Sequence, residues 1–240
     1  MEKRRNYHSL IPIYLLLIST CFLLTWLTSR AVTVWSESQP LPTGRCVVID
    51  AGHGGVDGGT TSCTGILESQ YNLEIALRLN DLMHLLGIDT VMIRTEDISI
   101  YTSGSSIAQK KISDLKERVR ITNETQDGIL LSLHQNYFSD SRYSGPQVFY
   151  APTQGSDVLA KELQKVLNHN LAPCSNRQVK KASGIYLMQH ISTTGVLVEC
   201  GFLSNVQEEA LLRTPDYQQK LCVVLATVIN NYLYGKNPVA

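Results

Sequence analysis

The most apolar stretch of the chain lies near its N-terminus. Leu10–Leu27 contains 18 residues without a charged side chain, and Lys3, Arg4 and Arg5 precede it. As a helix this stretch would be about 27 Å long, close to the thickness of the hydrocarbon core of a bilayer. Basic residues before an apolar segment keep the start of a chain in the cytoplasm, so the rest is predicted to lie outside. We interpret residues 1–30 as a basic cytoplasmic start and a membrane anchor, with a cleaved signal segment as the alternative.

Downstream, the hydrophobic pattern alternates between strand-like and helix-like runs. Residues 31–44 include a polar stretch with prolines and are predicted to be a linker, and residues 45–240 are predicted to form one domain. Short, continuous apolar runs predict buried strands at Arg45–Asp50, Ile88–Arg94, Gly128–Leu133, Gln147–Tyr150 and Gly195–Cys200. Helical spacing of apolar residues predicts helices at Glu68–Leu86, Ile112–Asn123, Ser156–Leu171 and Pro215–Tyr234. This alternation indicates an α/β fold whose sheet is covered by helices on both faces.

Composition removes several classes of protein from consideration. The chain carries 21 basic and 21 acidic residues, and a zero net charge argues against nucleic-acid binding, which normally needs a basic face. Hydrophobic residues make up 43% of the chain, enough to bury a core, which excludes a low-complexity disordered protein. The six cysteines contain no CxxC pair, so free thiols are expected rather than a disulfide framework or a zinc ribbon.

Chemically demanding residues lie where three of the predicted strands end. His53 follows the first strand, His134 follows GILLSL, Glu199 lies in GVLVEC, and Glu68 opens the first predicted helix. Strand ends of this kind meet at one edge of an α/β sheet. Two imidazoles and a carboxylate suit a catalytic zinc with a fourth position for water, and a second carboxylate beyond the ligands can take the water's proton. Each histidine could instead be a hydrogen-bonded core residue, and the helix dipole alone could account for Glu68.

Other catalytic motifs fit the sequence poorly. The glycine-rich loop fails as a GxGxxG fingerprint because Asp57, for which turn hydrogen bonds are predicted, stands at the last glycine position. No P-loop GK[ST] and no GxSxG elbow occur. A cysteine hydrolase that uses Cys200 with His134 is disfavoured. Cys200 directly follows Glu199 in a predicted strand and should point to the opposite face.

Four segments in fixed order carry a family resemblance: Val47–Gly59 (VVIDAGHGGVDGG), Leu67–Met83 (LESQYNLEIALRLNDLM), Ser132–Asn136 (SLHQN) and Leu197–Asn205 (LVECGFLSN). With these segments the chain resembles the zinc-dependent N-acetylmuramoyl-L-alanine amidases of the amidase 3 type over nearly the whole predicted domain. The resemblance implies a twisted, mostly parallel sheet flanked by helices. It also implies Zn²⁺ ligands at His53, Glu68 and His134, and a catalytic acid and base at Glu199.

Three further sequence segments resemble those of the germination-specific amidases of the spore cortex: the pair Gln135-Asn136, the segment Asn176–Lys180 (NRQVK) and the segment Ser183–Met188 (SGIYLM). This resemblance implies hydrolysis of the amide between N-acetylmuramic acid and L-alanine in peptidoglycan, which prepares muramic-δ-lactam formation together with a separate deacetylase. It implies action outside the cytoplasm, by a membrane-anchored or exported enzyme in the cell envelope. In a spore-forming host, the enzyme would be located in the forespore intermembrane space.

Several points stay open at the level of sequence. The alternative to an enzyme is a non-catalytic wall-binding or scaffold protein that kept the amidase fold. An accessory envelope protein that controls zinc loading or activity is a further hypothesis, because no separate wall-binding module is recognisable. Thr193 and Thr194 stand where the family commonly has proline before the catalytic strand. The serine-rich stretch Glu96–Lys111 has no assigned role, and no substrate-binding residue is assigned.

Overall fold

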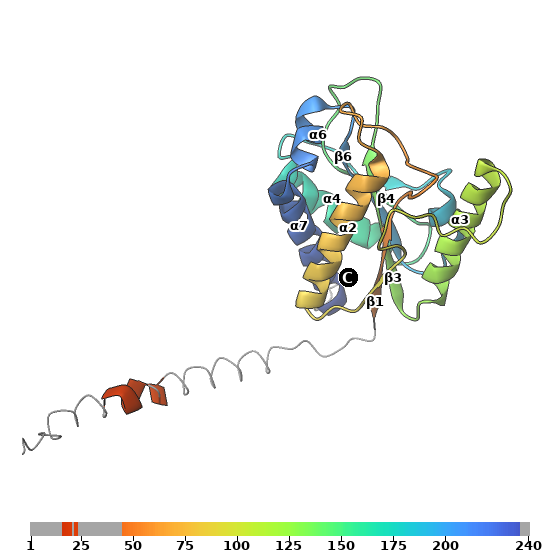
Figure 1. The fold of residues 1–240 in the computed structure, drawn as a ribbon. Helices are drawn as coiled ribbons and strands as arrows, with labels where there is room; N and C mark the ends of the chain where they lie inside the picture. The colour runs from red at the N-terminus through yellow and green to blue at the C-terminus, as the bar shows by residue number, and fades with distance from the viewer. Residues whose placement is uncertain (1–15, 21, 24–44, 236–240) are drawn as a thin grey trace, which may run out of the picture. The chain divides into compact units, whose positions relative to one another are not determined.

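The computed structural model describes residues 16–20, 22–23 and 45–235 (Figure 1). Most of the predicted membrane segment and all of the predicted linker, residues 31–44, lie outside the described residues, so both stay predictions. Among the described residues, no helix is both long enough and apolar enough to cross a membrane.

Six strands form one mixed sheet, in the order β2-β1-β3-β6-β4-β5. Their bounds are β1 Cys46–Ala51, β2 Thr90–Met92, β3 Gly128–Asn136, β4 Gln147–Tyr150, β5 Lys180–Lys181 and β6 Gly195–Phe202. Strands β2, β1, β3 and β6 are parallel to one another, as predicted. Strand β4 pairs with β6 in an antiparallel direction, and β5 pairs with β4 in a parallel direction. Four of the five strand pairings are thus parallel, as expected for a mostly parallel sheet, and the antiparallel pairing of β4 with β6 makes the sheet mixed. The connection between β3 and β4 contains no helix, and a parallel return requires a long crossover.

Helices cover both faces of the sheet (Figure 1). On one face lie α2 (Glu68–Leu85), α4 (Ser156–Leu171) and α7 (Pro215–Tyr234), with the short α6 (Val206–Leu212) against α7 and β6. On the other face lie α3 (Ile107–Glu124) and α5 (Tyr186–His190), which contact each other. Two of the predicted helices, α4 and α7, begin and end at the predicted residues.

Alternation along the strands assigns side chains to the two faces. In β1, Ile49 packs in the cluster with α2, while Val48 packs in the cluster with α3 and α5. In β6, Cys200 lies on the α2 side, and Leu197 lies on the α3 side. Because successive residues of a strand face opposite ways, Glu199 shares the face of Leu197 and is turned away from Cys200. This arrangement confirms the separation that disfavours a cysteine hydrolase.

A buried ion pair joins the sheet to α3. Asp50 in β1 and Arg118 in α3 are 1% and 3% exposed and are paired to each other. The hydroxyl of Ser132 donates to the second oxygen of Asp50 at 2.7 Å, and Arg118 also pairs with Asp114 at 2.5 Å. Burial alone would raise the pKa of Asp50, but Arg118, His134 and the Ser132 hydroxyl together hold it below its usual value. Asp50 is therefore a carboxylate that the fold keeps charged inside the core.

We expect Arg118→Met to lower the free energy of unfolding at pH 7 by about 3–5 kcal/mol, because it leaves Asp50 buried and unpaired. The pair stabilises the parent fully above the unfolded pKa of Asp, about 3.9, and its contribution disappears as pH falls through the lower folded pKa. The difference between parent and variant should therefore shrink in acid. Urea denaturation at several pH values measures it.

Arg120→Met is the matched control on the same helix. Arg120 is half exposed and pairs with Glu117 and Glu124 at the surface, so solvent screens these pairs and little change is expected. Equal losses of stability in the two variants would contradict a special role for the buried pair.

Candidate active site

His53 lies on the loop that follows β1, in a left-handed backbone conformation with φ of 62°. A tight turn follows it, in which Gly54 N donates to Asp57 O at 2.7 Å and Asp57 N donates to Gly54 O at 3.1 Å. The imidazole has carboxylates on both sides: Nδ1 lies 2.9 Å from Asp57 Oδ2, and Nε2 lies 3.3 Å from Glu68 Oε1. Burial lowers the pKa of His53, but the two carboxylates outweigh burial and raise the pKa to about 9.

Glu68 is the first residue of α2 and is only 4% exposed. Its Oε1 lies 2.9 Å from His134 Nδ1 and accepts the backbone N–H of Gln135 at 3.1 Å. Its Oε2 accepts the backbone N–H of Thr60 at 3.1 Å. Burial would raise the pKa of Glu68, but His134 and His53 lower it far below the usual range. The carboxylate is therefore ionised and fixed in orientation by groups from several elements.

His134 lies near the end of β3 and brings its imidazole beside that of His53. The ring centroids are 4.9 Å apart, and the planes are inclined by 77°. One donor atom from each of His53, Glu68 and His134 falls within 4.8 Å of the other two. The structure thus brings together the three residues predicted as zinc ligands, from a loop, a helix and a strand.

Glu199 in β6 is the register partner of His134 in β3. Its side chain is largely buried, and its Oε2 is sealed from solvent without a hydrogen-bond partner among the described residues. Burial raises the pKa of Glu199 to about 7; Glu68 pushes in the same direction, and the two histidines partly offset it. A carboxyl group with a pKa near neutrality can both accept and release a proton at working pH.

The donor set fits a zinc ion. Two imidazoles and one carboxylate with a free position for water are the ligands of catalytic zinc sites in proteins. His53 Nε2 and His134 Nδ1 both face the same oxygen, Glu68 Oε1. Hydrogen bonds from Gln135 and Thr60 hold that carboxylate, as is usual for metal-binding side chains.

The residues that support the site were missed at the level of sequence. Arg94, 2% exposed, donates to the backbone oxygens of Ala51 at 2.8 Å, Gly52 at 3.0 Å and Ser69 at 2.8 Å, so it ties the end of β1 to the start of α2. Asn72 donates to Gly52 O at 3.1 Å. A single arginine at the end of an apolar strand was the available signal for Arg94.

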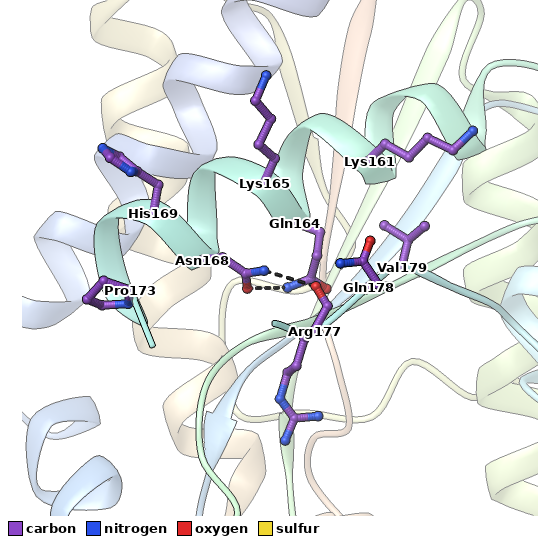
Figure 2. A pocket seen from close by; sticks show the side chains of 9 residues that line it. All are labelled: Lys161, Gln164, Lys165, Asn168, His169, Pro173, Arg177, Gln178 and Val179. Carbon is purple, nitrogen blue, oxygen red and sulfur yellow. Dashed lines mark hydrogen bonds between the residues drawn. The ribbon is translucent and has the colours of Figure 1, made fainter. Parts of the chain in front are cut away.

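A pocket beside α4 lies apart from these residues (Figure 2). Its walls are held by structural hydrogen bonds: Gln164 donates to Asn168 at 2.9 Å, and Asn168 donates to the backbone oxygen of Arg177, also at 2.9 Å. Lys161 extends away from these groups and pairs with Asp157 at 2.8 Å. None of the four candidate site residues lines this pocket, so it does not compete with the histidine and glutamate cluster as the active site.

We expect Gly52→Ala to disable the site, because a Cβ at this position would lie 2.2 Å from His134 Nε2. The imidazole must move, and displacement of a catalytic group by about 1 Å can cost about 100-fold in rate. A crystal structure of the variant and its catalytic rate relative to the parent measure the effect. Gly184→Ala is the control: its added Cβ meets nothing within 4 Å, so only backbone strain at φ of 73° is expected, with activity retained. Full activity of Gly52→Ala would contradict the close packing described.

Comparison with known proteins identifies the family of the chain. The Amidase_3 family, described as N-acetylmuramoyl-L-alanine amidase, matches residues 47–231. The chain is 32% identical over 238 residues to the germination-specific N-acetylmuramoyl-L-alanine amidase of Bacillus subtilis, and the alignment covers 98% of this chain and 98% of that protein. It is 31% identical over 180 residues to the amidase LytC of the same organism, across 74% of this chain and 33% of LytC.

Among solved structures, the CwlD amidase from Clostridioides difficile, determined in complex with the GerS lipoprotein, has a TM-score of 0.76 and 34% sequence identity. The match covers 80% of this chain and 99% of that one. A second amidase structure from Clostridium difficile 630 has a TM-score of 0.69 at 28% identity. Because the family match spans most of the chain and the germination-specific relative matches along nearly its full length, the chain belongs to the Amidase_3 family of N-acetylmuramoyl-L-alanine amidases.

Proposed function

We propose that this amidase is zinc-dependent and acts on spore-cortex peptidoglycan, where removal of the peptide from N-acetylmuramic acid prepares muramic-δ-lactam formation. The observation that carries the zinc assignment is the convergence of His53, Glu68 and His134 from three separate elements, with donor atoms within 4.8 Å. The cortex assignment rests on similarity to the germination-specific amidase across 98% of the chain.

The reaction needs a polarised carbonyl, a nucleophilic water and a proton for the leaving amine. A zinc ion held by the three ligands supplies Lewis-acid polarisation of the lactyl carbonyl and lowers the pKa of the attacking water. Glu68 is fixed by Gln135 and Thr60, so the ligand set does not have to rearrange during turnover.

Glu199 is proposed as the acid and base. It accepts the proton of the attacking water and delivers it to the nitrogen of L-alanine, which then leaves as an amine. Two features support this role. Its Oε2 is buried and has no hydrogen-bond partner among the residues that the structure describes, and its register partner in the sheet is the proposed ligand His134. Burying a carboxyl group without a hydrogen-bond partner lowers the stability of the folded protein. Carboxyl groups in such environments are found more often in active sites, where they take part in catalysis.

Two further elements of the proposal concern the setting of the enzyme. We place its action outside the cytoplasm, by a chain anchored in the membrane or exported to the envelope, and in the intermembrane space of the forespore if the host sporulates. We also propose that an accessory envelope protein controls zinc loading or activity. The CwlD structure supports this idea, because that amidase was solved together with a lipoprotein.

The alternative is a wall-binding or scaffold protein without activity. Such a protein would be expected to lose a ligand or the acid and base. Here His53, Glu68, His134 and Glu199 are all present at one edge of the sheet, so the enzyme is favoured.

We expect Glu199→Gln to retain zinc but to lose about 10²–10⁴-fold in hydrolysis, because the proton carrier is removed and the ligands are left intact. Zinc content by elemental analysis and the rate of peptide release measure the two effects separately. His134→Ala is the contrasting variant and should lose both zinc and turnover. Near-normal hydrolysis by Glu199→Gln would sink the acid and base assignment.

We expect the full chain, purified in detergent, to carry about one zinc per molecule, as a single catalytic site requires. It should release stem peptides that begin with L-alanine from cortex peptidoglycan, as read by mass spectrometry. A chelator should abolish release, and added zinc should restore it. Peptide release that continues after the zinc is gone would contradict zinc dependence. Zinc without release would indicate a missing accessory protein or another substrate form. Neither zinc nor release, even with candidate partners added, would favour the scaffold alternative.

A further inference from the structure

One face of α3 holds the loop that carries His53. Lys111, Asp114 and Arg118 are spaced by three and four residues, so they lie along the same side of the helix. Arg118 Nη2 donates to the backbone oxygen of His53 at 2.7 Å, and Lys111 Nζ lies 3.1 Å from Asp57 Oδ2. Asp114 accepts the backbone N–H of Ile100 at 2.7 Å. The helix therefore contacts the loop at the backbone of His53 and at the carboxylate beside its ring.

The serine-rich stretch Glu96–Lys111 adds contacts to the next residues of the loop. The Ser99 hydroxyl donates to Gly54 O at 2.6 Å and accepts from Val56 N at 3.2 Å. Asp97 Oδ1 accepts from Gly55 N at 3.1 Å. Residues 53–56 are thus each held by a hydrogen bond from α3 or from the stretch before it.

Glycine is required where this stretch crosses the loop. A Cβ at Gly54, which has φ of 134°, would lie 2.4 Å from the backbone oxygen of Ile98, and a Cβ at Gly55 would lie 2.6 Å from Ser99 N. The loop can approach this closely only because both positions lack a side chain. Contact with the loop that carries His53 is therefore one structural role of the stretch Glu96–Lys111.

The ring of His53 is oriented by what its two nitrogens face. Nδ1 lies 2.9 Å from Asp57 Oδ2, while Nε2 faces Glu68, on the side of His134. A histidine binds a metal as the neutral imidazole, with one N–H and one lone pair, so in the metal-bound state a donor bond from Nδ1 to Asp57 leaves the lone pair on Nε2. Histidines that bind metals commonly use a carboxylate in this way.

A turn role alone does not account for Asp57. Its contact within the turn, from Gly59 N to Oδ1, is long at 3.4 Å. Its shorter contacts go to the imidazole of His53 at 2.9 Å and to the ammonium of Lys111 at 3.1 and 3.2 Å. The ammonium is half exposed, so it orients the carboxylate more than it strengthens the fold.

We propose that Asp57 is a positioning residue for the metal ligand His53: its carboxylate accepts a hydrogen bond from Nδ1–H, so that Nε2 is presented as the ligand atom, and it is itself oriented by Lys111 of α3. This inference rests on the zinc site proposed above. It concerns the affinity and lifetime of the bound metal, not the chemical step.

The test compares zinc binding by the full chain and three variants, using a competing chelator for affinity and a zinc-release assay for the dissociation rate. Asp57→Asn is expected to bind zinc about 10–100-fold more weakly, the range found when such carboxylates are changed. Lys111→Met should show a smaller loss in the same direction. Ser99→Ala, which loosens the loop without touching the ring, is the matched control and should bind more tightly than Asp57→Asn.

A second readout separates positioning from loop support. In zinc-loaded protein with ¹⁵N-labelled histidine, the Nδ1 proton of His53 should be protected and shifted downfield, because it is bonded to a carboxylate. Asp57→Asn should shift this signal upfield or lose it to exchange with solvent, whereas Ser99→Ala should leave it in place. Loop support alone would not alter the Nδ1 signal.

Two results would overturn the proposal. One is Asp57→Asn binding zinc with the parent's affinity and dissociation rate. The other is equal weakening in Asp57→Asn and Ser99→Ala with the His53 signal unchanged in both, which would leave Asp57 only a turn residue. Failure of the zinc proposal itself would be seen separately, as a parent chain that binds no zinc.

Discussion

The buried carboxylate of Glu68 is the interaction on which the site depends. Taking an ionised carboxylate out of water is expensive, and only charged or hydrogen-bonding neighbours make it tolerable. Here His53 and His134 approach one of its oxygens, and the backbone N–H groups of Gln135 and Thr60 complete its environment. These neighbours come from β3 and from the loop between β1 and α2, so the fold must bring both segments to the start of α2 for Glu68 to stay charged.

The parallel sheet performs that convergence. Because β1, β3 and β6 lie side by side and parallel, the residues at their carboxyl ends reach the same edge. The register of β3 and β6 places His134 opposite Glu199. The site therefore contains two different carboxyl groups: Glu68, which is charged and held in place, and Glu199, whose pKa is raised to about 7. Two carboxyl groups in one site thus have environments suited to different roles, ligand and proton carrier.

Helix α3 connects this edge to the rest of the core. Its Arg118 is paired with Asp50 inside the sheet and also donates to the backbone of His53, so one side chain contributes both to the stability of the domain and to the shape of the loop that carries His53. Such coupling gives the loop a defined position despite the unusual backbone of His53 and the glycines around it. The position of this loop thus depends on residues outside the recognisable motifs.

The sequence by itself determined the kinds of groups in the site and most of the framework, because periodic apolar spacing and short motifs are local signals. Helices α4 and α7 match their predicted bounds, and the five predicted strands exist. The two-residue strand β5 was missed because so short an element has no pattern, and α3 begins at Ile107, before its prediction, through a capping box at Ser106. Two features were decided by the tertiary structure alone: that β4 runs antiparallel, and which distant residues contact the loop that carries His53. Arg94, Lys111 and Arg118 reach the loop from 42 to 65 positions away, by contacts that depend on how the helices pack.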